Sequence, residues 1–207
     1  MGIRERATLS LAVATGHGMS NIVDAARVWV QERLPWQARH LVRAYDWALE
    51  LDPGASEALV LAALTHDMER GYPQGSPTWF EGCWADTLYR MAHSERSARI
   101  VGDFLRDQRV AETHVRESVR LVVAHEIGGW PEADVLQAAD SLSFLETIQP
   151  VISKRLADGT ISAAGARAWL DFQFDRVRLE RARELGRPML LKATAELERE
   201  LSKSAVK

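Results

Sequence analysis

The feature that most constrains this chain is an apolar segment, residues 59–64, that ends abruptly in Thr65-His66-Asp67. Six successive residues that favour burial therefore carry an imidazole and a carboxylate to the edge of the core. This adjacent pair offers one nitrogen and one oxygen ligand, a combination that suits zinc, iron or manganese. A pair alone is weak evidence, so the metal hypothesis depends on further ligands elsewhere in the chain.

Length and composition exclude several classes of protein. The 207 residues fit one domain, or one domain with an appendage, and 46% hydrophobic residues suffice for a packed core. The formal net charge of −3 gives no reason to expect a nucleic-acid partner. The single cysteine, Cys83, excludes an intramolecular disulfide and fits a reducing compartment. Because no segment resembles a signal peptide or a membrane span, we expect a cytoplasmic protein without membrane contact.

The pattern of apolar residues predicts helices throughout, because they recur at helical spacing and alternation is too rare for a sheet. Ser56 predicts the start of the helix that carries residues 59–64. A long helix is expected over residues 163–185, separated by Gly186-Arg187-Pro188 from a last, charged helix. We therefore predict an all-α fold with three parts: an N-terminal helical segment packed on the domain (1–33), a metal-binding core (34–150) and C-terminal helices (151–207).

Residues 71–85 form the one long segment without helical character. Two glycines and two prolines within residues 71–77 exclude regular helix, and Trp79, Phe80 and Trp84 follow at once. Three large rings argue against a disordered linker. The segment is interpreted either as a lid whose rings stack on a nucleobase or as a plug packed over the helices, and the sequence leaves both open.

Further candidate ligands follow one another along the predicted helices. Each of them alone is more often a hydrogen-bonded core or surface residue than a metal ligand. Asp140 shares a helix face with Leu136 and has small or apolar neighbours, so burial of that face would leave a costly charge unless a cation compensates it. What argues against coincidence is the joint order of six residues: His40, His66, Asp67, His93, His125 and Asp140.

This order resembles the HD-domain superfamily of metal-dependent phosphohydrolases. The family pattern of a first His, an adjacent His-Asp and a distal Asp is matched by His40, His66-Asp67 and Asp140. The resemblance covers roughly residues 34–146 and extends to Ala-Leu-x-His-Asp, to His-Ser-x-x-x-Ala at 93–98 and to Ala-Ala-Asp at 138–140. It implies a single HD-type helical domain with a C-terminal helical extension.

The resemblance also implies a ligand set for two ions. By it, His40, His66, Asp67 and Asp140 would bind one metal, and Asp67 would bridge to a second ion held by His93 and His125. The chain has His125-Glu126 where some two-metal members have a doubled His. Glu126 is therefore either a partner of the ligands or an exposed helix residue.

The chemistry of such a centre is metal-assisted hydrolysis. Two divalent ions about 3.5–4 Å apart clamp the attacking and departing oxygens of an in-line displacement. With Asp67 and His66 as the catalytic pair, bound hydroxide attacks phosphorus and no protein nucleophile is needed. Accordingly, Cys83 is interpreted as a packed thiol. The cofactor is expected to be a divalent transition metal, two ions in number, with iron, manganese and others left open.

Candidate substrate-binding groups lie close to the ligands in sequence. Arg70 follows Asp67 by three residues and Arg96 follows His93 by three, so each arginine shares a helical face with its ligand. Arginine suits bidentate contacts with phosphate, and Trp79 is a candidate for stacking. The alternative is that a chain rich in arginine places one near any residue.

The preferred function is a phosphohydrolase acting on a small phosphate ester, with a nucleotide as the favoured substrate. One alternative is an HD-type mixed-valence diiron oxygenase, although the 15 residues from His125 to Asp140 look more like the hydrolases. Another is a non-catalytic HD regulatory module. The charged and aromatic helix around residues 172–181 favours a solvated face or a homodimer surface over nucleic-acid binding, because acidic residues are interspersed.

Overall fold

The apolar segment forms a short central helix. Helix α3 (Glu57–Thr65) begins at Ser56, whose hydroxyl accepts a hydrogen bond of 3.2 Å from the backbone N–H of Leu59, as the sequence predicted. Every residue from 58 to 65 is buried. The helix is therefore covered on all sides, and His66 closes it at the edge of the core.

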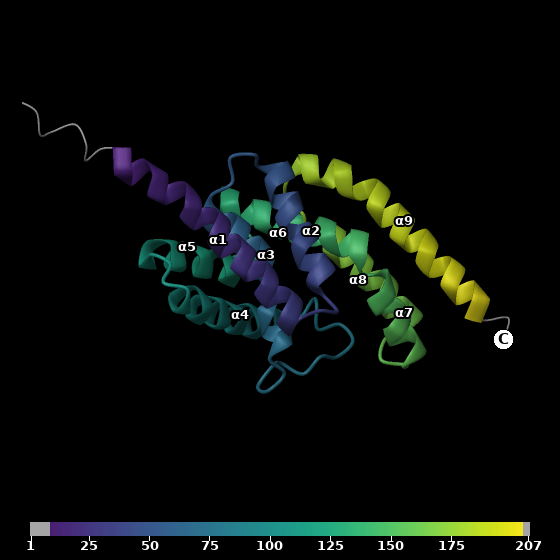
Figure 1. Cartoon of the computed structure of the whole chain (residues 1–207). Coiled ribbons are helices and arrows are strands. Elements are labelled where there is room, and N and C mark those ends of the chain that lie inside the picture. The colour runs from purple at the N-terminus through teal and green to yellow at the C-terminus, as the bar shows by residue number, and fades with distance from the viewer. Residues whose placement is uncertain (1–8, 205–207) are drawn as a thin grey trace, which may run out of the picture.

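The computed structural model describes residues 9–204, with side chains over residues 21–203. Over this range the chain forms nine α-helices and one 3₁₀ helix and no strand, which confirms the all-α fold (Figure 1). The first eight residues of the predicted segment 1–33 lie outside the described range. The remaining elements are α1 (Leu9–Arg33), α2 (Ala38–Leu51), η1 (Met68–Gly71), α4 (Thr87–Asp107), α5 (Glu112–Ala124), α6 (Pro131–Thr147), α7 (Gln149–Ala157), α8 (Ala163–Asp175) and α9 (Glu180–Ser204).

Two hydrophobic clusters hold these helices together. The larger one surrounds α3 with residues of α1, α2, α4, α5 and α6. The smaller one joins α7, α8 and α9 to the end of α6, and it includes Cys83 and Trp84 from the loop before α4. Trp84 is buried, whereas Phe80 is 48% exposed. Trp84 therefore anchors the loop against the C-terminal helices, and Phe80 does not. None of the helices in the described range has the length and apolar character needed to cross a membrane.

The boundary between the last two helices lies at a different place from the one predicted. The helix from Ala163 ends at Asp175, and Gly186 and Pro188 lie inside α9, which runs without interruption in Figure 1. A Cβ atom on Gly186 would lie 2.9 Å from Leu142 Cδ2, so the glycine permits close packing of α9 on α6 rather than a break. The break falls instead after Arg176, whose side chain is buried in ion pairs with Asp140 and Glu126.

Candidate metal centre

Six predicted ligands from five helical segments come together in the core. His66 and His125 close the C-terminal ends of α3 and α5, and Asp67 precedes η1. His93 lies inside α4, which begins at Thr87. All six side chains are buried, and they form two groups whose ligand atoms lie within 4.8 Å of one another: His40, His66 and Asp140; and Asp67, His93 and His125.

The first group has the spacing of ligands around a shared ion. His40 Nε2 and His66 Nε2 are 3.3 Å apart, and Asp140 Oδ1 is 3.2 and 3.3 Å from them. Ligand atoms bound at about 2.0–2.2 Å with tetrahedral or octahedral angles are separated by roughly 2.8–3.6 Å. The three atoms therefore form a triangle that fits one divalent ion.

The orientation of two imidazoles is fixed by their own helices. His66 Nδ1 lies 2.9 Å from the carbonyl oxygen of Ala63, and His125 Nδ1 lies 2.6 Å from that of Val122. A carbonyl can only accept, so Nδ1 carries the proton in both rings. Nε2 is then the atom that each ring directs to the site, and it offers a lone pair to an ion when the ring is neutral.

The other two imidazoles are fixed in the same sense by side chains. The Ser143 hydroxyl donates to the carbonyl oxygen of His40 at 2.6 Å, so its oxygen accepts from His40 Nδ1 at 2.9 Å. His93 Nδ1 lies 2.9 Å from Glu69 Oε1. All four histidines therefore hold a proton on Nδ1 and direct Nε2 inward, the tautomer pattern of metal-bound imidazoles.

The second group contains an unpartnered nitrogen. His93 Nε2 lies 2.7 Å from Asp67 Oδ1, whereas His125 Nε2 is buried without a hydrogen-bond partner among the described residues. A buried imidazole nitrogen without a partner is costly unless something coordinates it. These residues fit a divalent ion, with Asp67 grouped with His93 and His125.

The charges of the site have to be balanced by protons or by cations. Burial disfavours charged His66, but the carboxylates of Asp140 and Asp67 outweigh it and raise its pKa to about 9. Burial also raises the pKa of Asp67, yet Arg70 and His93 hold it well below its usual range. By contrast, burial and the neighbouring His66 and His93 lower the pKa of His125 to about 4. His125 is therefore neutral at pH 7 and available as a ligand.

Two arginines donate hydrogen bonds to the outer carboxylate oxygens of the acidic candidate ligands, Asp67 and Asp140. Arg70 Nε donates to Asp67 Oδ2 at 3.0 Å, and Gln37 donates to the same oxygen. Arg176 donates to Asp140 Oδ2 and to Glu126, and its Nε donates to Ser141 Oγ at 2.9 Å. Both free oxygens of the carboxylate ligands are thus occupied by positively charged or amide donors.

Glu126 is a partner of the site rather than an exposed helix residue. Its side chain is only 13% exposed, it pairs with Arg176, and Oε1 lies 3.8 Å from His125 Nε2. Four residues that support the candidate ligands were not predicted from the sequence: Gln37, Glu69, Ser143 and Arg176. The only sequence signal for Glu69 as a partner of the site is its position two residues after Asp67, beside a buried segment.

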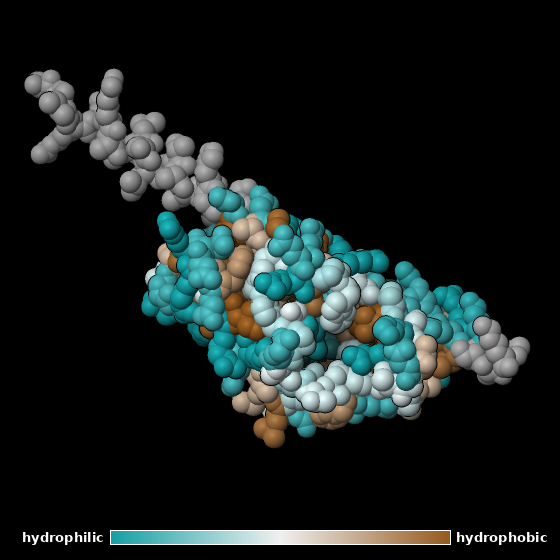
Figure 2. Space-filling view, turned by 60° about the horizontal axis from the view of Figure 1, so that its bottom comes forward, coloured by the Kyte–Doolittle hydropathy of each residue, from teal (hydrophilic) through white to brown (hydrophobic). Residues whose placement is uncertain are grey.

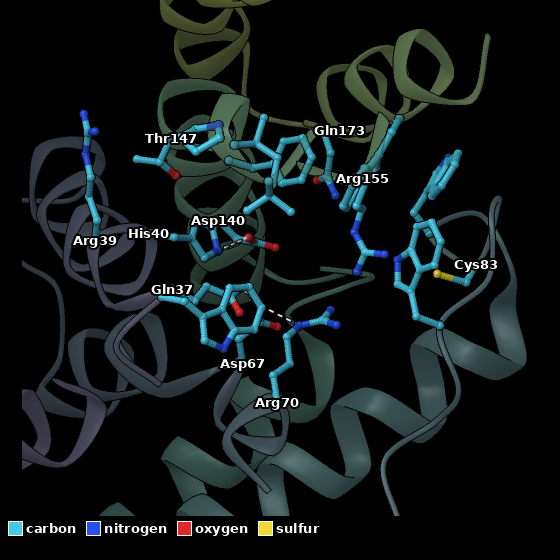
Figure 3. A pocket seen from close by; sticks show the side chains of 18 of the residues that line it. Gln37, Arg39, His40, Asp67, Arg70, Cys83, Asp140, Thr147, Arg155 and Gln173 are labelled. Atoms are coloured by element: carbon cyan, nitrogen blue, oxygen red, sulfur yellow. Dashed lines mark hydrogen bonds and ion pairs between the residues drawn. The ribbon is translucent and has the colours of Figure 1, made fainter. Parts of the chain in front are cut away.

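A pocket opens directly from the ligands. Its lining includes Gln37, His40, Asp67, Arg70, Glu126 and Asp140 at one end, and Trp79, Cys83, Trp84, Phe144, Arg155, Trp169 and Gln173 at the other. The cavity volume of about 180 Å³ is more than ten times the roughly 10–15 Å³ that one water needs. Figure 3 shows Arg70 and Arg155 directed into it from different sides, and Figure 2 shows the hollowed face on which the loop before α4 lies.

The predicted substrate-binding residues separate in the structure. Arg70 and Trp79 line the pocket. Arg96 lies against the loop instead, where its guanidinium donates to the carbonyl oxygens of Glu69, Tyr72 and Gln74 at 3.3, 2.8 and 2.6 Å. Arg96 therefore anchors the first half of the loop, and Cys83 is a buried thiol whose pKa is raised by burial.

Comparisons with protein-family models, with curated proteins and with solved structures return no match to this chain.

Proposed function

We propose that this chain is an HD-type metal-dependent phosphohydrolase that uses a binuclear centre to hydrolyse a small phosphate ester, with a nucleotide as the favoured substrate. The observation that carries the proposal is the common orientation of four imidazoles, His40, His66, His93 and His125. Each holds its Nδ1 proton on a fixed acceptor and directs Nε2 toward a carboxylate-lined site. The ordered resemblance of the sequence to the HD superfamily supports the same conclusion.

The residues divide the chemistry among them. Two divalent ions, held by the two ligand groups, would supply Lewis acidity and an acidified water for attack on phosphorus. Asp67 keeps its ligand oxygen in position because Arg70 and Gln37 hold the other oxygen. Arg70 uses Nε for that contact and faces the pocket, so its terminal N–H groups are placed to donate to phosphate oxygens.

The pocket supports a substrate with a planar or apolar part. Trp84 and Trp169 are stacked with ring centroids 5.3 Å apart, and Phe144 lies 5.0 Å from Trp169. These rings form an apolar wall beyond the ligands. A nucleoside presents a flat, partly apolar surface of the kind that aromatic side chains bind.

Metal content and phosphate release test the proposal together. Protein purified anaerobically is expected to contain about two transition-metal ions per chain and to release phosphate from members of a panel of nucleotides and phosphate esters. His125→Ala should lower both the metal content and the turnover. His114→Ala is the matched control, because His114 is an exposed histidine of the same helix.

Three results would overturn the proposal. Iron together with substrate-dependent oxygen uptake and no phosphate release would identify a mixed-valence diiron oxygenase. Absence of bound metal and of turnover would identify a non-catalytic module. Equal metal content and turnover in the wild type and in His125→Ala would remove His125 from the site.

A further inference from the structure

Arg155 is a cation in the pocket that lacks an anionic partner. It extends from α7, its guanidinium lies 3.7 Å from the ring centroid of Trp79, and Figure 3 shows it directed into the cavity. Among the described residues no carboxylate lies within ion-pair distance of it, whereas Arg70 and Arg176 are both paired. Its acidic neighbour Asp158 is bonded at 2.6 Å to Lys154 on the outside of the helix.

The same end of the pocket holds a second donor without an acceptor. Arg155 Nε and Trp169 Nε1 are both buried, and neither donates to any group in the part of the chain that the structure describes. Buried donors, and cationic ones above all, are costly to leave unpaired. Both residues line the same cavity, so an anionic ligand group bound there would enter a region with unpaired donors.

The arrangement around Arg155 holds the charge in place. Stacking on Trp79 restricts the guanidinium without using its N–H groups. Burial and the nearby charge of Arg70 lower the pKa of Arg155, so its charge carries an electrostatic cost that a bound anion would offset. The amide of Gln173, whose oxygen is buried without a partner among the described residues, lines the same cavity.

We propose that Arg155 and Trp169 form a subsite for a second oxyanion, so that the preferred substrate carries a phosphate at the metal centre and a further phosphate or carboxylate group at Arg155. This inference rests on the proposed function for the position of the first phosphate. It narrows the substrate class from phosphate esters in general to those with two anionic groups.

Binding of non-hydrolysable ligands tests this subsite without relying on turnover. The probes are methylphosphonate, alkane-α,ω-bisphosphonates of one to four carbons and the matching phosphonocarboxylates, titrated calorimetrically into metal-loaded protein. At the best chain length the wild type is expected to bind a two-anion probe about tenfold or more tightly than methylphosphonate. Bisphosphonates and phosphonocarboxylates distinguish phosphate from carboxylate as the second group.

Variants at two neighbouring positions, Arg155 and Lys154, show which residue produces the preference for two-anion probes. Arg155→Gln should abolish the preference for two anions and leave methylphosphonate affinity within about twofold, and Arg155→Lys should restore part of it. Lys154→Gln removes the same charge from the outer side of α7 and should keep the full preference. Metal content measured after each titration excludes loss of ions to the probe.

The outcomes separate this inference from the proposed function. Phosphate release by the wild type, with a two-anion preference that is absent or unchanged in Arg155→Gln, would overturn the subsite alone. Binding that depends on Arg155 in a protein that hydrolyses no phosphate ester would overturn the proposed function and retain the subsite. An equal loss of affinity for all probes in Arg155→Gln and Lys154→Gln would indicate a general charge effect and overturn the subsite.

Discussion

The two ends of the pocket differ in how their polar groups are satisfied. At the ligand end every imidazole has its Nδ1 proton on an acceptor, and the outer oxygens of Asp67 and Asp140 are held by Arg70 and Arg176. At the far end, Arg155 Nε and Trp169 Nε1 are buried without partners in the described chain. The ligand end is therefore oriented by the protein and leaves the inward His125 Nε2 open to an ion, whereas at the far end both donors are left for whatever binds there.

This difference implies that the two ends of the pocket have different roles. In the proposed function the preorganised end would determine the chemistry, because its groups need no rearrangement during the reaction. An end with unsatisfied donors selects among ligands, because only a ligand with matching acceptors removes the cost of the buried donors. Substitutions at the two ends should accordingly change different measurable quantities.

The largest effect is expected from Asp67→Asn. It removes a charge from the ligand set, so kcat/KM on the best phosphate ester should fall by roughly 10²–10³-fold or more, together with metal content. Asp103→Asn changes a carboxylate that is 78% exposed and should leave both unchanged. An Asp67→Asn protein with activity near that of the wild type would refute the assignment of the ligand end.

Arg176→Gln tests whether the outer partners stabilise the fold. In chelator-treated protein it leaves Asp140 and Glu126 buried without their cation, so the free energy of unfolding should fall by roughly 3–5 kcal/mol. Arg167→Gln breaks an exposed pair with Glu198 and should cost no more than about 1 kcal/mol. Denaturant titrations of both variants give the comparison, and equal losses would contradict it.

The stability of the metal-free protein should depend on pH through His66. Its folded pKa of about 9 exceeds the unfolded value of about 6.5, so its stabilising contribution is complete below pH 6.5 and is lost as pH rises through 9. The loss is on the order of 3 kcal/mol and can be followed by urea unfolding between pH 6.5 and 9. Metal-loaded protein should lack this dependence, because the ion takes the place of the proton.

Ser143→Ala tests how much the hydrogen-bond partner of a candidate ligand contributes to metal affinity. Without the hydroxyl, His40 loses the acceptor that fixes its tautomer, and metal affinity should fall by about 10–100-fold. Ser118→Ala is the control, because this buried hydroxyl has no hydrogen-bond partner in the described residues. Competition with a chromogenic chelator measures both affinities, and a Ser143→Ala protein with wild-type affinity would place the preorganisation elsewhere.

The smallest effect is expected at the far end from Trp79→Leu. Loss of the ring frees the Arg155 guanidinium, and affinity for a two-anion phosphonate should fall by roughly threefold to tenfold. Metal content should stay at the wild-type value. A decrease in bound metal would show that the two ends are not separable.

The sequence predicted the all-α fold, and the six residues that it singled out come together in the core, for local reasons. Ser56 capped its helix as expected, and the candidate ligands lie on or at the ends of helices that are evident from their apolar residues. Apolar residues report which parts of a helix are buried, and residues 59–67 and 136–145 are buried. Residues whose position follows from their own helix were therefore accessible without a structure.

The far end and Arg176 could not be predicted in this way. Gly186 and Pro188 are the stronger breaking signals, yet the chain breaks at Arg176 because that side chain is buried in ion pairs with Asp140 and Glu126. These pairs join residues 36 and 50 positions apart, and no local pattern reports them. Arg155 likewise reaches the pocket only through the packing of α7 and α8 beside the loop.

The anchors of the four histidines have a consequence for tolerance to mutation. His66 and His125 each donate to a backbone carbonyl three residues earlier, so any amino acid that keeps the helix at positions 63 and 122 preserves the anchor. His40 and His93 instead bond to the side chains of Ser143 and Glu69, so a single substitution at either position removes the acceptor for the Nδ1 proton. Substitutions should therefore be tolerated more freely beside His66 and His125 than beside His40 and His93, within the same candidate metal centre.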